Sequence, residues 1–136
     1  MISALSLSSS CERENDDCHK QIKFANNSDK DVYVQFDGSY PDTTYFGHGP
    51  SPANEPGLHK VVANTTSNTV LQDRSCLEYV IRGERVPSDT LMIFVFDALV
   101  IDTNDWADVV HFYLVEKRYD LSLGDLVGMN WTINYP

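Results

Sequence analysis

The chain has 136 residues, of which 42% are hydrophobic and 11% aromatic, and this is enough for one globular domain with its own apolar core. Its 20 acidic residues outnumber its 10 basic residues, which gives a formal net charge of −10. A nucleic-acid backbone requires clustered Lys and Arg, so this charge argues against nucleic acid as a partner. No apolar run approaches the roughly 20 residues that a helix needs to cross a bilayer.

The first ten residues, MISALSLSSS, carry no charge. They resemble the end of a secretory signal, which has a basic start, an apolar centre and small residues at the cleavage site. Three serines precede Cys11, as small residues precede the cysteine that receives a diacylglycerol in bacterial lipoproteins, although Leu7 stands one position too early. An unstructured N-terminus with an incidental cysteine is the alternative. We expect residues 1–10 to be the remnant of a lipoprotein signal and Cys11 to be the lipid-attachment site.

An acidic segment follows this cysteine at once. Residues 12–17 read ERENDD, with four acids and one base. A solvated segment of this composition can hold a folded domain away from a membrane, so we expect a tether over residues 11–18 and a single domain over residues 19–136. The segment also resembles the acidic signal that sends lipoproteins of Bacteroidetes to the cell surface. The sequence therefore predicts a lipid anchor in the outer membrane, on its periplasmic or its exposed face.

The chain has three cysteines, and their spacing restricts their chemistry. If Cys11 carries lipid, Cys18 and Cys76 remain, and an exported domain can pair them in a disulfide. Zinc is a weaker alternative because no CxxC pair occurs. A cysteine nucleophile is also weaker, because His19 adjoins Cys18 and neighbouring residues on a strand point to opposite faces.

From residue 20 onward, apolar and polar residues mostly alternate, which is typical of β-strands. The segments KQIKFA and VYVQF flank the polar turn NNSDKD and are predicted to form a hairpin, with Tyr33 and Gln35 facing outward. Three further strands are predicted in LHKVVAN, NTVLQD and CLEYVIR. The six apolar residues 91–96 predict a strand buried on both faces at the centre of the sheet.

Two short helices are predicted in the last third. Apolar residues from Trp106 to Tyr113 recur at i, i+3, i+4 and i+7, and Asp102 or Asn104 could cap that helix. The segment LSLGDLVG has a helix-start pattern of Ser and, three residues later, Asp. LVEKRY and NWTINY are predicted strands. Together these elements favour a mainly β fold, an antiparallel β-sandwich of immunoglobulin-like or similar type with two short helices.

The segment 37–57 interrupts the alternation with four prolines and four glycines. A loop of this length in a compact domain is usually functional or disordered. Its aromatic residues Tyr40, Tyr45 and Phe46 could cap the core or form a recognition surface for a protein or a glycan. We name them as a candidate ligand-binding loop. The Asp-Thr-Thr sequence at Thr43 resembles an acceptor motif for O-glycosylation in exported Bacteroidetes proteins.

Catalysis is the weaker functional class. The segment 97–111 contains four aspartates and His111 after a buried strand, where acids can act as general acid and base. Helix capping explains Asp102 and Asp105 equally well. GxSxG, phosphate-loop and HExxH motifs do not occur, and the four histidines lack metal-ligand spacing. We therefore expect no enzyme, catalytic residue, metal or cofactor, with a small envelope hydrolase as the alternative.

The last third carries a family resemblance. SDTLMIFVFDA followed by YLVEKRYDLSLGDLVGMNWTINYP resembles a family of small predicted lipoproteins of gut and oral Bacteroidetes, and the likeness covers residues 18–136. Gly124 and Gly128 depart from its pattern, because better helix formers are usual there. The family has no assigned activity, so the resemblance implies export and one β-rich domain. We expect a non-catalytic binding or structural module, and an accessory subunit of a surface assembly remains a third reading.

Overall fold

The computed structural model describes residues 15, 17–47 and 50–136. The predicted signal remnant, the predicted lipid-attachment site Cys11 and most of the predicted tether lie outside these residues. Within them the chain is mainly β, with one sheet of three strands and one of four. The prediction of a mainly β fold is therefore confirmed.

The three-stranded sheet has the order β4-β1-β7. Its central strand β1 (Gln21–Asn26) pairs antiparallel with β4 (Thr65–Gln72) and parallel with β7 (Thr132–Tyr135). The buried residues Ile22 and Phe24 alternate along β1 as the sequence predicts. The parallel pairing with the last strand departs from a wholly antiparallel arrangement.

The four-stranded sheet has the order β3-β2-β5-β6, and all its pairs are antiparallel. Its strands are β3 (Lys60–Val61), β2 (Val32–Asp37), β5 (Thr90–Asp97) and β6 (Lys117–Ser122). Residues 91–96 of β5 are all buried. The prediction of a central strand buried on both faces is confirmed.

The predicted hairpin between the first two strands is wrong, because β1 and β2 belong to different sheets. Phe24 of β1 and Val34 of β2 both enter one apolar cluster that contains residues of both sheets. The two strands therefore face each other across the core instead of pairing edge to edge. The buried amide of Asn26 fixes the connection between them, because its Nδ2 donates to the carbonyls of Lys30 (2.8 Å) and Val61 (3.1 Å).

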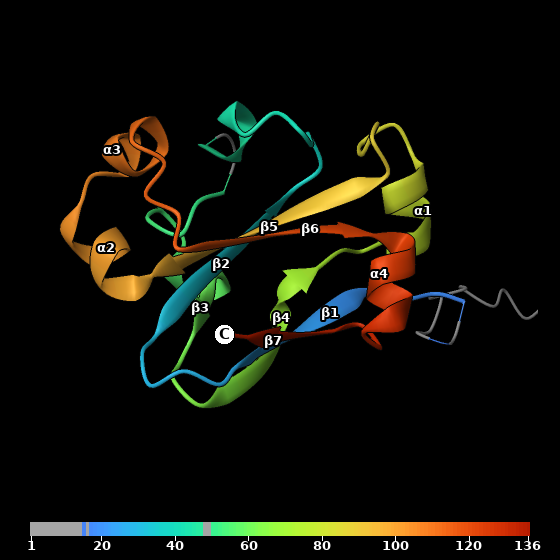
Figure 1. The fold of residues 1–136 in the computed structure, drawn as a ribbon, viewed down its shortest axis with the longest axis horizontal. Coiled ribbons are helices and arrows are strands. Elements are labelled where there is room, and N and C mark those ends of the chain that lie inside the picture. Colours follow the sequence, from blue (N-terminus) through green and yellow to red (C-terminus); the bar gives the residue numbers. More distant parts are fainter. Residues whose placement is uncertain (1–14, 16, 48–49) are drawn as a thin grey trace, which may run out of the picture.

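The α-helices of the described residues gather at the two ends of the sheets (Figure 1). One end carries α1 (Leu77–Arg82) and α4 (Leu123–Gly128), and the other carries α2 (Ala98–Thr103) and α3 (Trp106–His111). Two 3-10 helices, η1 (Thr44–Gly47) and η2 (Pro56–Leu58), lie in the long loop. None of the helices that the structure describes has the length and apolar character needed to cross a membrane.

Three predictions about helices need correction. The sequence analysis predicts two short helices, whereas the described residues contain four α-helices, because α1 and α2 were not among the predicted helices. CLEYVIR is the helix α1 and not a strand, and its buried residues Leu77, Val80 and Ile81 have helical spacing. The helix α3 has Asp105 as its N-cap residue, in place of the predicted Asp102 or Asn104. The predicted cap of α4 is confirmed: the Ser122 side chain accepts from the Asp125 backbone, and the Asp125 side chain accepts from the Ser122 backbone.

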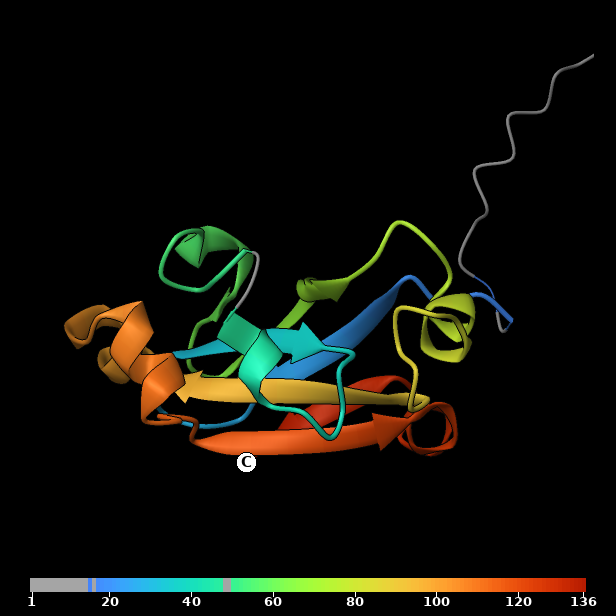
Figure 2. The ribbon, with the colours of Figure 1, turned by 90° about the horizontal axis from the view of Figure 1, so that it is seen from above.

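A second apolar cluster covers the opposite face of the four-stranded sheet. Phe94 and Phe96 of β5 pack there against Phe46 of η1 and against residues of α2 and α3. In the view from above, η1 lies in front of β5 and β2 (Figure 2). This layer buries Tyr33 and Gln35, which the strand alternation had placed toward solvent.

The structure contains the disulfide between Cys18 and Cys76, whose Cα atoms lie 4.9 Å apart. Both cysteines are buried. Cys18 lies just before β1, and Cys76 is the N-cap residue of α1. The bridge therefore ties the start of the first strand to a helix, where the sequence analysis expected a second strand.

Candidate functional site

The long loop and the acidic segment, which the sequence analysis treated as rival sites, meet at one cavity. The cavity has a volume of about 470 Å³ and is open to solvent between residues 52–56, residues 101–106 and β2. It is called the loop–helix cavity below. The side chains that give it chemical character are Tyr33, Asn54, Asp102, Asn104, Asp105 and Trp106.

Tyr33 lines the loop–helix cavity from the face of β2 that the second apolar cluster covers. Its hydroxyl donates a hydrogen bond of 2.9 Å to Oδ1 of Asp102. Burial of the ring, and then this bond, raise the pKa of Tyr33 above its usual value of 10.0. The phenol therefore stays protonated at physiological pH, and its hydroxyl donates its hydrogen to the Asp102 carboxylate.

Trp106 forms one wall of the cavity. Its Nε1 donates to the carbonyl oxygen of Gly47 at 3.4 Å, which ties the start of α3 to the end of η1. The indole ring meets Phe46 edge-on, with centroids 6.0 Å apart, and Phe96 at 5.7 Å. A half-buried aromatic ring held in this way is fixed before any ligand arrives.

The structure separates the three aromatic residues of the predicted ligand-binding loop. Phe46 is only 1% exposed and belongs to the second apolar cluster, so this residue is a core residue and cannot contact a ligand. Tyr40 is 36% exposed but does not line the loop–helix cavity. The side chain of Tyr45 lies outside the described part of the structure. Thr43 is half-buried just before η1, and its glycosylation stays a prediction.

The acidic residues of the segment 97–111 also have different positions and contacts. Asp97 caps α2 by accepting from the backbone of Leu99 at 3.0 Å, and it forms an ion pair with Lys30. His111 is exposed on α3. Of the residues named for catalysis, Asp102 and Asp105 line the loop–helix cavity. Among the described residues, no three His, Cys, Asp or Glu side chains are placed to hold a metal ion.

The loop–helix cavity combines aromatic walls with carboxylate and amide groups. Pockets of this kind bind polar molecules, because the rings cover apolar faces and a few placed acceptors fix the orientation. Asn54 was missed at the sequence level, and the loop sequence gives no signal for it. Trp106 was assigned only to the apolar face of a helix, and nothing in that pattern shows that its ring would wall a cavity.

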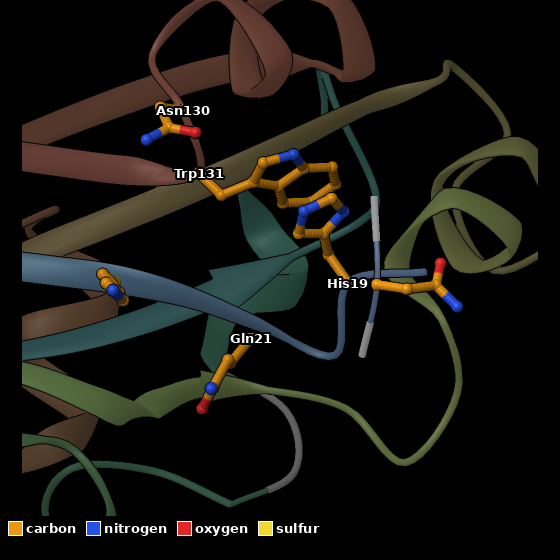
Figure 3. Close-up of a pocket in the computed structure, with 6 residues that line it drawn as sticks. His19, Gln21, Asn130 and Trp131 are labelled. Atoms are coloured by element: carbon orange, nitrogen blue, oxygen red, sulfur yellow. The ribbon is translucent and has the colours of Figure 1, made fainter. Parts of the chain in front are cut away.

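A second cavity, of about 290 Å³, lies near α1. It is lined by Asn15, His19, Gln21, Lys23, Asn130 and Trp131. Figure 3 shows the imidazole of His19 lying against the indole of Trp131 at this cavity. The Nδ1 atom of His19 lies 2.6 Å from Oε1 of Glu78, so the histidine side chain is already committed to contacts within the protein.

The chain was compared with family models, with curated proteins and with solved structures, and none of the three comparisons finds a match. The loop–helix cavity is the site that joins the two segments singled out by the sequence.

Proposed function

We propose that this chain is an exported, lipid-anchored envelope protein whose domain is a non-catalytic module that binds a glycan. The observation that carries the proposal is the loop–helix cavity, where Tyr33, Asp102 and Trp106 meet across segments far apart in the sequence. Export is supported by the Cys11 context and by a disulfide, a bond that persists in oxidising compartments. The resemblance to small Bacteroidetes lipoproteins supports the same location.

The proposed domain type is an immunoglobulin-like β-sandwich. Three- and four-stranded sheets with one shared apolar cluster support it, because constant-type immunoglobulin domains divide their seven strands in the same way. The bridge from Cys18 to the helix α1 differs from the inter-sheet disulfide of that fold. The proposal therefore concerns the layering and not a shared ancestry.

A glycan suits the loop–helix cavity for two reasons. Its hydroxyl groups are donors, and the carboxylates of Asp102 and Asp105 together with the amide oxygens of Asn54 and Asn104 are acceptors. Its ring C–H faces are apolar and can cover the Trp106 indole. A chain of net charge −10 also repels polyanions, so a neutral glycan is favoured over an acidic one.

Glycan capture by the full chain, followed by calorimetric titration, tests this proposal. Asp105→Asn keeps a good N-cap residue for α3 and removes one carboxylate from the cavity, so capture should fall by about tenfold with an unchanged melting temperature. Asp108→Asn is the matched control, because Asp108 lies on the same helix and does not line the cavity. Equal affinity of wild type, Asp105→Asn and Asn54→Ala would exclude the loop–helix cavity as the binding site.

The specific observation that favours a hydrolase as second candidate is that Asp102 and Asp105 line one cavity. Two carboxyl groups across a glycosidic bond can act as acid and base or nucleophile. Turnover of chromogenic glycosides that disappears in Asp102→Asn and Asp105→Asn would favour the hydrolase. Capture without turnover would favour the binding module. Co-purification of one stable partner would instead favour an accessory subunit of a surface assembly.

The lipid anchor has its own test. Mass spectrometry of native membrane material should find diacylglycerol on Cys11, and Cys11→Ser should move the protein to the soluble fraction. A membrane-bound Cys11→Ser protein, or an unmodified thiol at this position, would contradict the proposed anchor.

A further inference from the structure

A further cavity lies beside the loop–helix cavity, at the end of the sheets that carries α2 and α3 (Figure 1). It has a volume of about 340 Å³ and is open to solvent. Its lining residues are Asp97, Val100, Asn104, Leu114, Val115 and Glu116. We call this space the Val100 cavity.

The helix α2 contributes to both cavities. Ile101 and Asp102 line the loop–helix cavity, whereas Val100 lines the Val100 cavity. Asn104, the C-cap residue of α2, lines both of them. The two cavities therefore meet at this side chain, and a molecule that occupies one of them can extend past Asn104 into the other.

Hydrogen bonds hold the Asn104 side chain at this junction. Its Nδ2 donates to the carbonyl oxygen of Val100 at 2.9 Å, and its backbone N–H donates to the same oxygen at 3.1 Å. The residue is exposed, so a hydroxyl group of a bound ligand can donate to its Oδ1. Asn104 can therefore contact a ligand at the point where it passes from one cavity to the other.

The walls of the Val100 cavity are apolar. Val100, Leu114 and Val115 are half-buried, so part of each side chain remains accessible to a ligand. Leu114 and Val115 pack inward against the second apolar cluster, and the Leu114 N–H donates to the Val109 carbonyl at 2.9 Å. These contacts fix the apolar surface before a ligand binds, which lowers the entropy cost of binding.

The charged groups at the Val100 cavity restrict the ligand further. Its charged lining residues are Asp97 and Glu116, and Lys30 forms ion pairs with both of them. Because two carboxylates share one ammonium group, the net charge there is negative and repels an anionic ligand. A cationic group would have to displace Lys30 from these ion pairs. A neutral apolar group fits this cavity best.

We propose that the sugar in the loop–helix cavity carries a short alkyl or acyl chain, and that this chain lies in the Val100 cavity. The inference rests on the proposed function and names its ligand class, a neutral glycoside with an apolar substituent. Transfer of the chain from water to the apolar walls supplies the added affinity. A glycolipid in a bilayer keeps its chains in the hydrocarbon core, so the cavity suits a soluble glycoside with a short chain.

Calorimetric titration of the full chain with pairs of glycosides tests the inference. The methyl and hexyl β-glycosides of glucose, galactose and mannose share the sugar and differ only in the length of the chain. A fully buried methylene raises affinity about fourfold, and half-burial in an open cavity about twofold. For a sugar that binds, the hexyl glycoside should therefore bind about thirtyfold more tightly than the methyl glycoside. Hexanol, which lacks the sugar, should bind more weakly than the hexyl glycoside.

Nuclear magnetic resonance of the same samples locates the chain. The methyl resonances of Val100, Leu114 and Val115 should shift with the hexyl glycoside and not with the methyl glycoside. The indole resonance of Trp106 should shift with both, because Trp106 lines the loop–helix cavity, where the sugar is expected.

The ratio of hexyl to methyl affinity separates the two cavities in variants. Val100→Thr keeps the shape of the side chain and puts a hydroxyl group in the apolar wall, so the ratio should fall about fivefold. Val127→Thr is the matched control, because Val127 is 62% exposed on α4 and lines neither cavity, and it should keep the wild-type ratio. Asp105→Asn should weaken both glycosides by the same factor, because Asp105 lines only the loop–helix cavity.

Four outcomes would overturn the inference: equal affinity for the methyl and hexyl glycosides, hexanol binding as tight as that of the hexyl glycoside, no shift of the three methyl groups, or an unchanged ratio in Val100→Thr. The first three need only the wild-type protein, so they decide the matter even if the variant does not fold. Methyl glycoside binding that Asp105→Asn weakens, without a gain from the hexyl chain, would overturn this inference and support the proposed function. No binding of any glycoside to the wild type would overturn both.

Discussion

The imidazole of His19 stacks on the indole of Trp131, with ring centroids 4.1 Å apart and an angle of 9° between the planes. The same histidine bonds to Glu78 twice, through Nδ1 to Oε1 (2.6 Å) and through its backbone N–H to Oε2 (2.9 Å). These contacts join His19, which lies two residues before β1, to the helix α1 and to Trp131, the residue before β7. We call the three side chains the His19 cluster.

Removal of the histidine ring should destabilise the fold. His19→Ala loses the stacked pair and the side-chain bond to a carboxylate, so the free energy of unfolding should fall by about 2 kcal/mol. Urea denaturation of the full chain measures this change. His111→Ala is the control, because His111 is exposed and a substitution there should cost less than about 0.5 kcal/mol. Equal effects of the two substitutions would contradict a structural role for the stack.

Glu78 should make stability depend on pH on the acid side. Burial of this carboxyl acts to raise its pKa, but the hydrogen bonds from the His19 backbone and ring outweigh burial and lower the pKa below the usual 4.5. A lowered folded-state pKa stabilises the protein above pH 4.5, and this contribution is lost as the pH falls through the folded-state value.

Glu78→Gln should therefore flatten the decline in stability below pH 4.5, as measured by urea denaturation at a series of pH values. Asp120→Asn is the control, because Asp120 is exposed and pairs with Arg118 on the surface strand β6. A decline of the same steepness in wild type and Glu78→Gln would contradict the prediction.

The disulfide should contribute more than any single side-chain contact. Cys18 and Cys76 are 58 residues apart, and closing a loop of this length restricts the unfolded chain by about 4 kcal/mol on the chain-entropy model. The double variant Cys18→Ala/Cys76→Ala should show that loss in denaturation experiments. Reduction of the wild-type protein should lower its stability to a similar extent, and a loss below about 1 kcal/mol in both experiments would refute the prediction.

Substitution by alanine at two glycines should change the stability of the fold in opposite directions. A Cβ on Gly38 would lie 2.6 Å from the carbonyl oxygen of Arg85 and 2.8 Å from a methyl group of Val86, so Gly38→Ala should destabilise. A Cβ on Gly128 meets nothing within 4 Å, and this residue belongs to α4. Gly128→Ala should stabilise by up to about 1 kcal/mol. Thermal denaturation distinguishes the two, and shifts of the same sign would contradict the argument.

Several elements could be predicted from the sequence because one local signal determined each of them. The apolar run 91–96 is long enough to define a strand that is covered on both faces. Ser122 and Asp125 have the spacing of a reciprocal helix cap, and the bonds they form are local. Patterns of this kind need no knowledge of distant residues.

The errors came from contacts that depend on distant residues. Alternation identified β1 and β2 as strands, but it could not determine that Phe24 and Val34 approach the core from different sheets. The segment 77–82 has an apolar and β-branched composition that suits a strand, while its buried positions follow a helical period. Tyr33 was expected in solvent because the layer that covers it, from η1 to α3, has no signal within β2 itself.

The candidate site was predicted in pieces and not as a whole. The loop 37–57 and the acidic segment 97–111 were each singled out, but their residues are some fifty positions apart. Only the fold places Asn54 and Trp106 at one cavity.

The parallel pairing of β1 with β7 bears on when this protein can fold. Lys23 pairs with Thr132, which follows it by 109 residues, so the middle strand of its sheet lacks one neighbour until residue 132 has been synthesised and has left the ribosome. Pairing between residues so far apart in the sequence makes folding slow. It therefore favours folding after synthesis over folding during synthesis. A polypeptide that remains unfolded during synthesis is in the state that a secretion channel accepts, and the topology itself would then keep the chain competent for transport.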